Sequence, residues 1–518
     1  MTRFKPFALA GALFVVTACS LPSSAQSVRL GTIDFPTSGA ADAKPHFIRG
    51  VLFLHSFEYG AAADEFRKAQ KANPDFAMAY WGEAMTQTHP VWNEQDVAAA
   101  RLILSRLART PQERLSKAPT SREKKYLEAI ETLYGDGSKA RRDTLYSASM
   151  KRIVDAHPED MEAKAFYALS LIGLSQGVRN VSTYERAGRI AETIFKQNPD
   201  HPGAAHYIIH AYDDPTHAQQ GLTAARAYSK IAPGAAHAQH MTTHIFLAMG
   251  MWDEVVSQNE IASGHDHDAW TPNHYTSWLN YAYLQQGRYA DALHMLEKMM
   301  PSARRRVEGR QLWALLSMRA RYLIDTEEWD SPIATGSVDI SGLGVSARGY
   351  WSFVNGLRAL RKRDTATAAK ELSTLVQANL LSSSTVDPNI ILEKELTALV
   401  RLAEGKRDEA LELMRDAARR EDSMAVEFGP PAILKPTHEL LGEILLEIGR
   451  PKDAHSEFKR ALELAPMRSR SLLGLARAAM AMGDSAGAAR SYADLRRVWH
   501  RADPKVRNLA ELRAFTGS

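Results

Sequence analysis

The sequence predicts an all-α fold, an α-solenoid of stacked helix–turn–helix repeats. Related residues recur at intervals of 34 positions, which is the signature of a repeat array. Between these positions the apolar residues follow the helical period, and no stretch alternates with period two over a useful length, so we expect no sheet. The length agrees, because 518 residues exceed the ~250–300 at which a single core stops growing, whereas a solenoid grows by adding repeats.

The repeat is clearest over residues 433–466 and returns near both ends of the chain. Small residues let two helices approach, an aromatic residue fills the gap between them, and a proline ends the second helix. These positions are Gly442, Gly449, Ala454, Phe458, Ala461 and Pro466 in that unit, then Ala476, Gly483, Ala488, Tyr492 and Leu495, and near the start Gly50, Ala62, Phe66, Ala69 and Pro74. The pattern resembles the tetratricopeptide repeat, which implies an α-solenoid.

Weaker copies of the unit fill the middle of the chain. Amphipathic segments occur there in pairs, 121–134 with 143–157 and 161–174 with 185–197. Each pair has the length and spacing of one helix–turn–helix unit. We therefore expect the array to continue between its two clear ends.

Turn-forming residues interrupt the array over residues 330–346, where charge is sparse. We therefore divide the chain into an N-terminal tetratricopeptide-like solenoid over 40–328 and a C-terminal tetratricopeptide solenoid over 346–518. Stacked repeats share a continuous core, so these two arrays are able to pack together rather than swing freely.

Longer stretches resemble a group of uncharacterised exported bacterial tetratricopeptide proteins. The stretches that carry this resemblance are residues 77–85 with 89–92, 240–246, 429–431 and 436–442. The resemblance covers most of the chain after residue 40. It implies the solenoid but no reaction.

Residues 1–25 have the features of an export signal. Arg3 and Lys5 precede an apolar stretch that is too short to span a bilayer permanently. Cleavage before Cys19, in a lipoprotein-type box, would leave that cysteine lipidated, whereas an ordinary site would end the signal at Ala25. Both alternatives place the protein in the cell envelope, as an outer-membrane lipoprotein or as a periplasmic or secreted protein. A lipid on Cys19 would then be the only membrane contact.

The composition excludes several classes of protein. Hydrophobic residues make up 45% and charged residues 24%, which is ordinary for a soluble protein. A net charge of +4 gives no electrostatic case for nucleic acid, so we expect no nucleic-acid partner. The single cysteine excludes a disulfide framework and a cysteine-rich zinc site.

Histidines are placed in phase with the repeat. His206 and His210 are four residues apart, and His240 and His244 repeat this pair 34 residues later. His274 and Trp278 continue the series after another 34 residues. Residues four apart share a helix face, and the first helices of such repeats line the concave side, so we expect these side chains along an inner groove.

Three interpretations of this histidine series remain open. Neutral imidazoles suit zinc, copper, nickel or iron, and four of them could converge on one divalent transition metal such as zinc. The four are His206, His210, His240 and His244, with further ligands or acceptors available from His201, His217, His237, Asp213, Asp214 and the turn 264–268. Alternatively the histidines contact a ligand in the groove without metal, or they only hydrogen-bond between packed helices.

The function expected from these observations is binding rather than catalysis. Gly173-Leu174-Ser175-Gln176-Gly177 matches a serine-hydrolase pattern, but a helical segment precedes it where that chemistry needs a strand. We expect an exported scaffold that binds a peptide or protein partner in the histidine-lined groove, with Glu83 and His89 as outlying groove residues. The alternative is a metal-binding protein or metalloenzyme that uses the same histidines.

Overall fold

The structure is a computed structural model. It describes residues 28–515 except 177, 265–269, 304–308, 337, 339, 341–343, 381–387 and 426–427. The leader with Cys19, and most of the histidine-rich turn after Gly264, therefore lie outside the described residues. Within the described part, no helix combines the length and apolarity that crossing a membrane would need.

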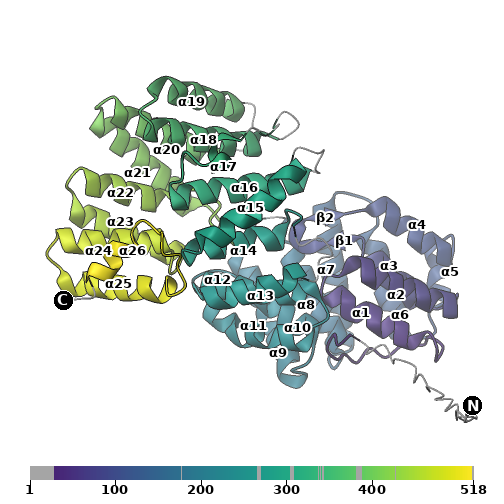
Figure 1. The fold of residues 1–518 in the computed structure, drawn as a ribbon. Helices are drawn as coiled ribbons and strands as arrows, with labels where there is room; N and C mark the ends of the chain where they lie inside the picture. Colours follow the sequence, from purple (N-terminus) through teal and green to yellow (C-terminus); the bar gives the residue numbers. More distant parts are fainter. Residues whose placement is uncertain are drawn as a thin grey trace, which may run out of the picture.

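Helices dominate the first half of the chain (Figure 1). In order they are α1 (Lys44–His55), α2 (Tyr59–Ala72), α3 (Ala77–Met85), α4 (Val97–Leu107), α5 (Pro111–Ser116), α6 (Ser121–Leu133), α7 (Lys139–Ala156), α8 (Met161–Gly173), α9 (Val181–Gln197), α10 (Pro202–Ala211), α11 (Ala218–Ile231), α12 (Ala236–Ala248), α13 (Trp252–Gly264), α14 (His274–Gln285), α15 (Tyr289–Ala303) and α16 (Gly309–Thr326).

Helical pairs continue through the second half (Figure 1). They are α17 (Pro332–Thr335), α18 (Val345–Arg361), α19 (Thr365–Leu380), α20 (Pro388–Ala403), α21 (Arg407–Ser423), α22 (Thr437–Glu447), α23 (Pro451–Leu464), α24 (Ser469–Ala481), α25 (Ser485–Val498) and α26 (Leu509–Ala514). The prediction of an all-α solenoid is confirmed, and the amphipathic pairs expected over 121–157 and 161–197 correspond to α6 with α7 and α8 with α9.

The expectation of no sheet is wrong at one place. Strands β1 (Thr88–His89) and β2 (Glu94–Gln95) pair antiparallel around the 3₁₀ turn η1 (Pro90–Trp92), with Thr88 opposite Gln95. Two-residue strands are too short to produce a recognisable alternation in the sequence, which is why the pattern gave no sign of them.

Near each end of the chain, neighbouring helices pack around an aromatic ring held between two glycines. The ring of Phe66 on α2 lies against Gly50 of α1 and Gly82 of α3, where an added Cβ would meet it at 2.7 and 2.3 Å. Phe458 on α23 lies in the same way between Gly442 and Gly474, at 2.9 and 2.3 Å. Both rings are fully buried. The absence of a side chain on the glycines thus sets how closely neighbouring first helices approach.

The N-terminal array turns tightly enough for its first helix to contact its later ones. α1 packs against α10 as well as against α2 and α3, and α10 packs against α8 and α12. Figure 1 shows this as the purple helices lying beside the teal ones. The end of α1 therefore reaches the middle of the array, which brings His55 next to α10.

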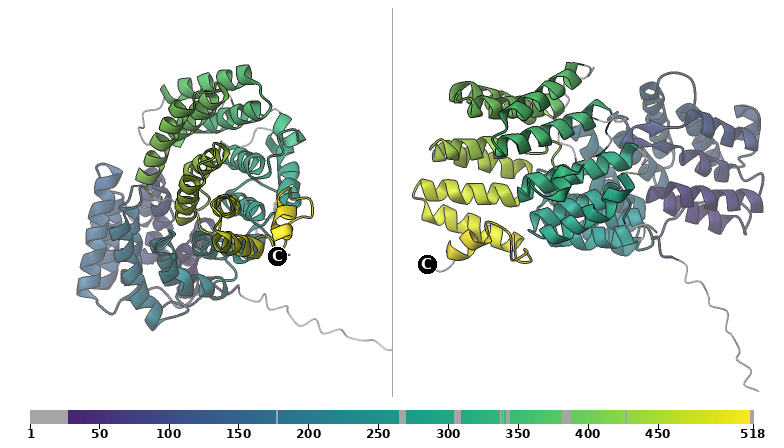
Figure 2. Two further views of the ribbon diagram at one scale, coloured as in Figure 1. Left: turned by 90° about the vertical axis from the view of Figure 1, so that its left-hand side faces the viewer. Right: turned by 45° about the horizontal axis from the view of Figure 1, so that its top comes forward.

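The C-terminal repeats curve back onto the N-terminal array (Figures 1 and 2). Trp252 Nε1 donates to the carbonyl of Met467 at 3.0 Å, and Trp499 Nε1 donates to the carbonyl of Gln285 at 3.1 Å. One buried core runs from Leu30 to Leu512, so both arrays contribute to it.

A buried arginine joins the same surfaces. Arg468 contacts Asp325 of α16 at 2.7 Å and Glu439 of α22 at 2.8 Å, and it donates to the hydroxyl of Tyr281 at 3.2 Å. All of these side chains are buried. This cluster therefore links the returning repeats to α14 and α16 through buried polar contacts.

The glycine–aromatic packing can be tested by adding one methyl group. In Gly82→Ala the new Cβ has no room beside the Phe66 ring, so we expect the free energy of unfolding to fall by about 1–3 kcal/mol in chemical denaturation. Gly60→Ala is the matched control, because Gly60 is also helical and its added Cβ meets nothing within 4 Å. Equal effects of the two substitutions would contradict this account of the packing.

Candidate functional site

Six histidines from three neighbouring helices form a continuous group, which we call the histidine wall. His206 and His210 come from α10, His237, His240 and His244 from α12, and His274 from the first position of α14. Pro202 at the start of α10 and the capping box of Asn273 and Thr276 before α14 fix where two of these helices begin. The pairs that are four residues apart do share a face, since their ring centres lie 4.8 and 5.0 Å apart.

Rings one repeat apart are lateral neighbours at two places along the wall. His240 and His274 have ring centres 4.5 Å apart, and those of His210 and His244 are 5.8 Å apart. Between His206 and His240 stands His237, at 5.1 and 6.2 Å from them. The sequence named His237 only as an additional ligand, yet it is the residue that makes the series continuous.

The ring nitrogens gather into two sets of three rather than one set of four. The first trio is His206, His210 and His237, and the second trio is His240, His244 and His274. Within each trio one nitrogen of every ring lies within 4.8 Å of the others. The four histidines that the sequence placed around one ion are thus divided between two neighbouring clusters.

The three rings of the first trio are buried, and their Nε2 atoms are not hydrogen-bonded to any described residue. His206 donates from Nδ1 to the carbonyl of His55 at 2.6 Å, which leaves its Nε2 with a free lone pair. Among the described residues, nothing bonds to Nε2 of His206, His210 or His237.

The second trio has its rings oriented by polar side chains. His244 Nδ1 lies 2.5 Å from a carboxylate oxygen of Asp213, and His240 Nδ1 lies 2.8 Å from the amide oxygen of Asn259. Their Nε2 atoms face each other at 3.2 Å. His274 completes the trio and is the one member of the wall that is exposed.

Burial keeps most of the wall uncharged. It lowers the pKa of His206 to about 3 and lowers the pKa of His210, His237 and His240 well below 6.5. Neighbouring histidines lower the pKa of the last three further. These four rings are therefore neutral near pH 7, which is the form that binds metals.

Aromatic side chains enclose the wall on both sides. Trp278 is buried against His244 and His240, with ring centres 4.3 and 4.9 Å away. Phe57 covers the first trio, 4.2 Å from His206. The ring centre of Phe428, from the segment between α21 and α22, lies 5.2 Å from that of His244. Except at His274, the wall is thus an interior feature rather than the open lining that the sequence suggested.

The two outlying residues occupy different surroundings. Glu83 is buried and binds Arg67 at 2.9 Å, Gln70 at 2.7 Å and Arg106, so its carboxylate joins α2, α3 and α4 instead of facing a groove. His89 is partly exposed and stacks on Tyr59 with ring centres 4.0 Å apart.

A third cluster joins His201, which the sequence offered as a further ligand, to His55 and Glu162, which it did not single out, and all of its polar atoms are paired. Glu162 of α8 accepts from Nε2 of His55 at 2.7 Å and from Nε2 of His201 at 3.1 Å. His55 Nδ1 bonds to the hydroxyl of Tyr207 at 2.9 Å, and His201 Nδ1 caps α10 through the amide of Ala204. The three groups lie 39 or more residues apart in sequence, so no local motif reveals the cluster.

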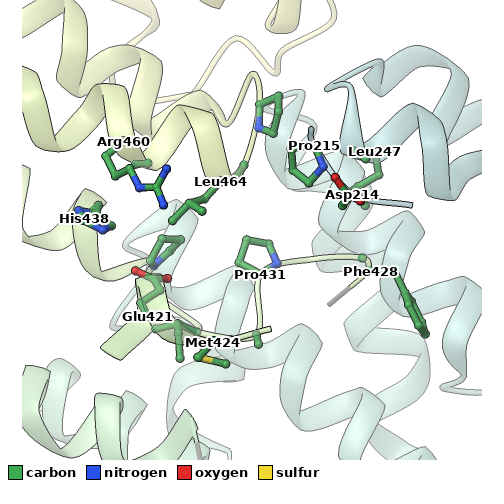
Figure 3. Close-up of a pocket in the computed structure, with 18 of the residues that line it drawn as sticks. Asp214, Pro215, Leu247, Glu421, Met424, Phe428, Pro431, His438, Arg460 and Leu464 are labelled. Carbon is green, nitrogen blue, oxygen red and sulfur yellow. The ribbon is translucent and has the colours of Figure 1, made fainter. Parts of the chain in front are cut away.

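A cavity of about 180 Å³ lies beside the wall. Figure 3 shows side chains that line it. Its lining combines Leu247 of α12 with Phe428 and Pro431 of the segment before α22 and with Arg460 and Leu464 of α23. Asp213 belongs to the lining and also holds His244, so the cavity and the second trio share a residue.

Ionisation of Glu162 in the third cluster should make the free energy of unfolding depend on pH in acid. Burial opposes ionisation of Glu162, but the charges and hydrogen bonds of His201 and His55 outweigh it and lower the pKa of Glu162 to about 2. A carboxyl with a lower pKa when folded adds stability above its ordinary pKa of 4.5, and that stability is lost as the pH falls toward 2. We expect Glu162→Gln to lower the free energy of unfolding by about 3 kcal/mol at pH 7 and to flatten its decline below pH 4.5, in denaturation series over pH.

The control for that series is Glu128→Gln, at an exposed position of α6. It should follow the wild-type profile throughout. Two outcomes would contradict the assigned ionisation of Glu162. One is a wild-type free energy of unfolding that does not change between pH 4.5 and pH 2, and the other is the same pH dependence in both variants.

Comparison with known proteins found one family match and several similar solved structures. Residues 440–506 match the family model described as the tetratricopeptide repeat. No curated protein matches the sequence. Among solved structures, the human IFIT1 dimer with m7Gppp-AAAA is 13% identical with a TM-score of 0.38, over 91% of this chain and 91% of that one. Yeast Tom70 is 11% identical with a TM-score of 0.32, over 90% of this chain and 99% of that one.

At this level of identity the ligands of those proteins say nothing about this chain. The matched segment spans the C-terminal helices in which Phe458 lies between Gly442 and Gly474, and the same packing recurs around Phe66 near the N-terminus. Residues 440–506 therefore form tetratricopeptide repeats, and the chain as a whole is an α-solenoid of helix pairs.

Proposed function

We propose that this protein is an exported tetratricopeptide scaffold that binds a peptide or protein segment, with the cavity in Figure 3 receiving an apolar side chain of that segment. Scaffolds of this fold act through extended inner surfaces whose contacts are set one repeat at a time. The cavity is the observation that carries the proposal, because it lies where the returning C-terminal repeats approach α12 and so draws its lining from both arrays.

The charged groups around the cavity are already paired. Asp213 holds His244, Asp214 binds Arg179 at 2.7 Å, and Arg460 binds Asp422 at 2.7 Å. What remains for a ligand is the apolar part of the lining, including Leu247, Phe428 and Leu464. A volume of about 180 Å³ fits one large side chain rather than a whole peptide, so the cavity suits an anchor residue.

In this proposal the histidines of the wall lie beside the binding cavity and do not line it. His274 is exposed and is available to a partner, whereas the other five rings are buried behind aromatic side chains. Phe428 contacts both the cavity and His244, so a segment bound in the cavity would lie one side chain away from the wall.

The binding proposal is tested by filling the cavity. Leu464→Trp adds bulk from the end of α23 at a position that is only partly buried, so the fold should persist. We expect peptides selected from a random display library on the wild-type protein to bind this variant at least ~10-fold more weakly in fluorescence anisotropy, about 1.4 kcal/mol. Leu102→Trp, at an exposed leucine of α4, is the matched control and should bind normally. Failure to select any peptide, or equal binding by both variants, would contradict the proposal.

The export part of the proposal concerns the mature N-terminus. Mass spectrometry of the protein made in a Gram-negative host should find a chain that begins at a diacylated Cys19 or at Gln26, because the leader carries both cleavage patterns. A mature chain that retains Met1 and the whole leader would overturn export.

A further inference from the structure

We propose that the histidine wall contains two adjoining binding sites for transition-metal ions of the zinc class, one in each trio, and that the protein binds two such ions per chain. The two sites have the same donor chemistry, three imidazole nitrogens each, but differ in access. The first trio is enclosed, whereas the second opens to solvent through His274.

The second trio already has the spacing of a metal site. Two nitrogen ligands at about 2.0–2.1 Å from a tetrahedral zinc ion lie roughly 3.3 Å apart. The Nε2 atoms of His240 and His244 are 3.2 Å apart, and a nitrogen of His274 lies within 4.8 Å of them. Without a shared ion or proton, two lone pairs at that distance would repel each other.

The groups behind the second trio are those that accompany metal-binding histidines. A histidine that binds metal through one nitrogen usually donates its other N–H to a carboxylate or carbonyl oxygen. His244 does so to Asp213 at 2.5 Å, and His240 does so to Asn259 at 2.8 Å. Both acceptors are buried, so they hold the rings with Nε2 directed at the same point.

The first trio is identified by its unpaired nitrogens. Buried polar atoms are nearly always hydrogen-bonded, because leaving one unpaired destabilises the folded state. Within the described part of the chain, the Nε2 atoms of His206, His210 and His237 all lack a partner. His206 also donates from Nδ1 to the carbonyl of His55, which directs its Nε2 lone pair into the trio. A single ion would satisfy all three nitrogens.

The third cluster shows what a structural histidine group looks like in the same molecule. His55, His201 and Glu162 are equally buried and equally close, but their donors and acceptors are matched one to one. Nothing there requires an ion. The contrast indicates that the unpaired nitrogens of the first trio are specific to it and do not simply reflect burial of histidine.

The donor set defines the class of ion. Neutral imidazole suits zinc, copper and nickel, whereas magnesium and calcium require oxygen ligands. Three histidines leave at least one coordination position for water or another ligand in a four-coordinate ion. In the second trio this position is on the exposed side, next to His274.

Zinc binding by the tag-free protein tests the proposal. Protein stripped with a chelator and dialysed should take up two equivalents of zinc in calorimetric titration, and elemental analysis should find two ions per chain. His237→Gln should remove one equivalent by disabling the first trio, His274→Gln should remove the other, and the double variant should bind none. His46→Gln is the matched control, because His46 is paired with Glu65 outside the wall, and it should still bind two.

Each other outcome would overturn the two-site assignment. Uptake of no zinc by the wild-type protein excludes both sites, and uptake of one equivalent excludes one of them. Two equivalents that persist in the folded double variant place the ions elsewhere. If His237→Gln fails to fold, X-ray absorption of the zinc-loaded wild-type protein decides, because a shell with fewer than three imidazole nitrogens per ion contradicts the trios.

Discussion

The structure depends on close, in-phase stacking of successive helices, which near both ends of the chain is set by an aromatic ring held between two glycines. Phe66 between Gly50 and Gly82, and Phe458 between Gly442 and Gly474, occupy the space that two Cβ atoms would take. In these two units the ring determines how closely the flanking first helices approach. Because the phase is kept from one unit to the next, side chains 34 residues apart become lateral neighbours, as His240 and His274 do at 4.5 Å. The histidine wall is a consequence of that regular stacking.

The sequence predicts the features that local packing determines, but not those that depend on contacts between distant segments. Glycine and aromatic positions, helix pairs and the face shared by His240 and His244 all follow from spacing along the chain. The return of the C-terminal repeats does not, because it rests on Arg468 meeting Asp325, 143 residues away. The same applies to His55, whose partner Glu162 lies 107 residues along the chain. Periodicity in the sequence does not predict contacts between residues so far apart. The interior position of the wall and its division into trios are therefore visible only in the structure.

Whether a buried histidine is structural or a ligand depends on its second nitrogen. In His55 both nitrogens are bonded, to Glu162 and Tyr207, and the ring serves as a cross-link between helices. In His206 one nitrogen is anchored by a backbone carbonyl and the other is unpaired. Both histidines are fully buried on helices, and a sequence presents them identically. The two rings differ in the hydrogen-bond partners that the fold places beside their nitrogens. This difference distinguishes the third cluster from the wall, whereas burial does not.

Two residues contact both the cavity and the second trio. Asp213 lines the cavity and orients His244, and the ring of Phe428 packs on His244 while its segment forms one side of the cavity. A partner side chain that displaced Phe428 would expose His244, and any movement of Asp213 would weaken its hold on the same ring. Because the orientation of a ligating imidazole governs metal affinity, occupation of the cavity and of the second trio must then be thermodynamically linked, and each ligand would change the affinity for the other by the same factor. A scaffold built this way would couple partner binding to metal without any change in its helical framework.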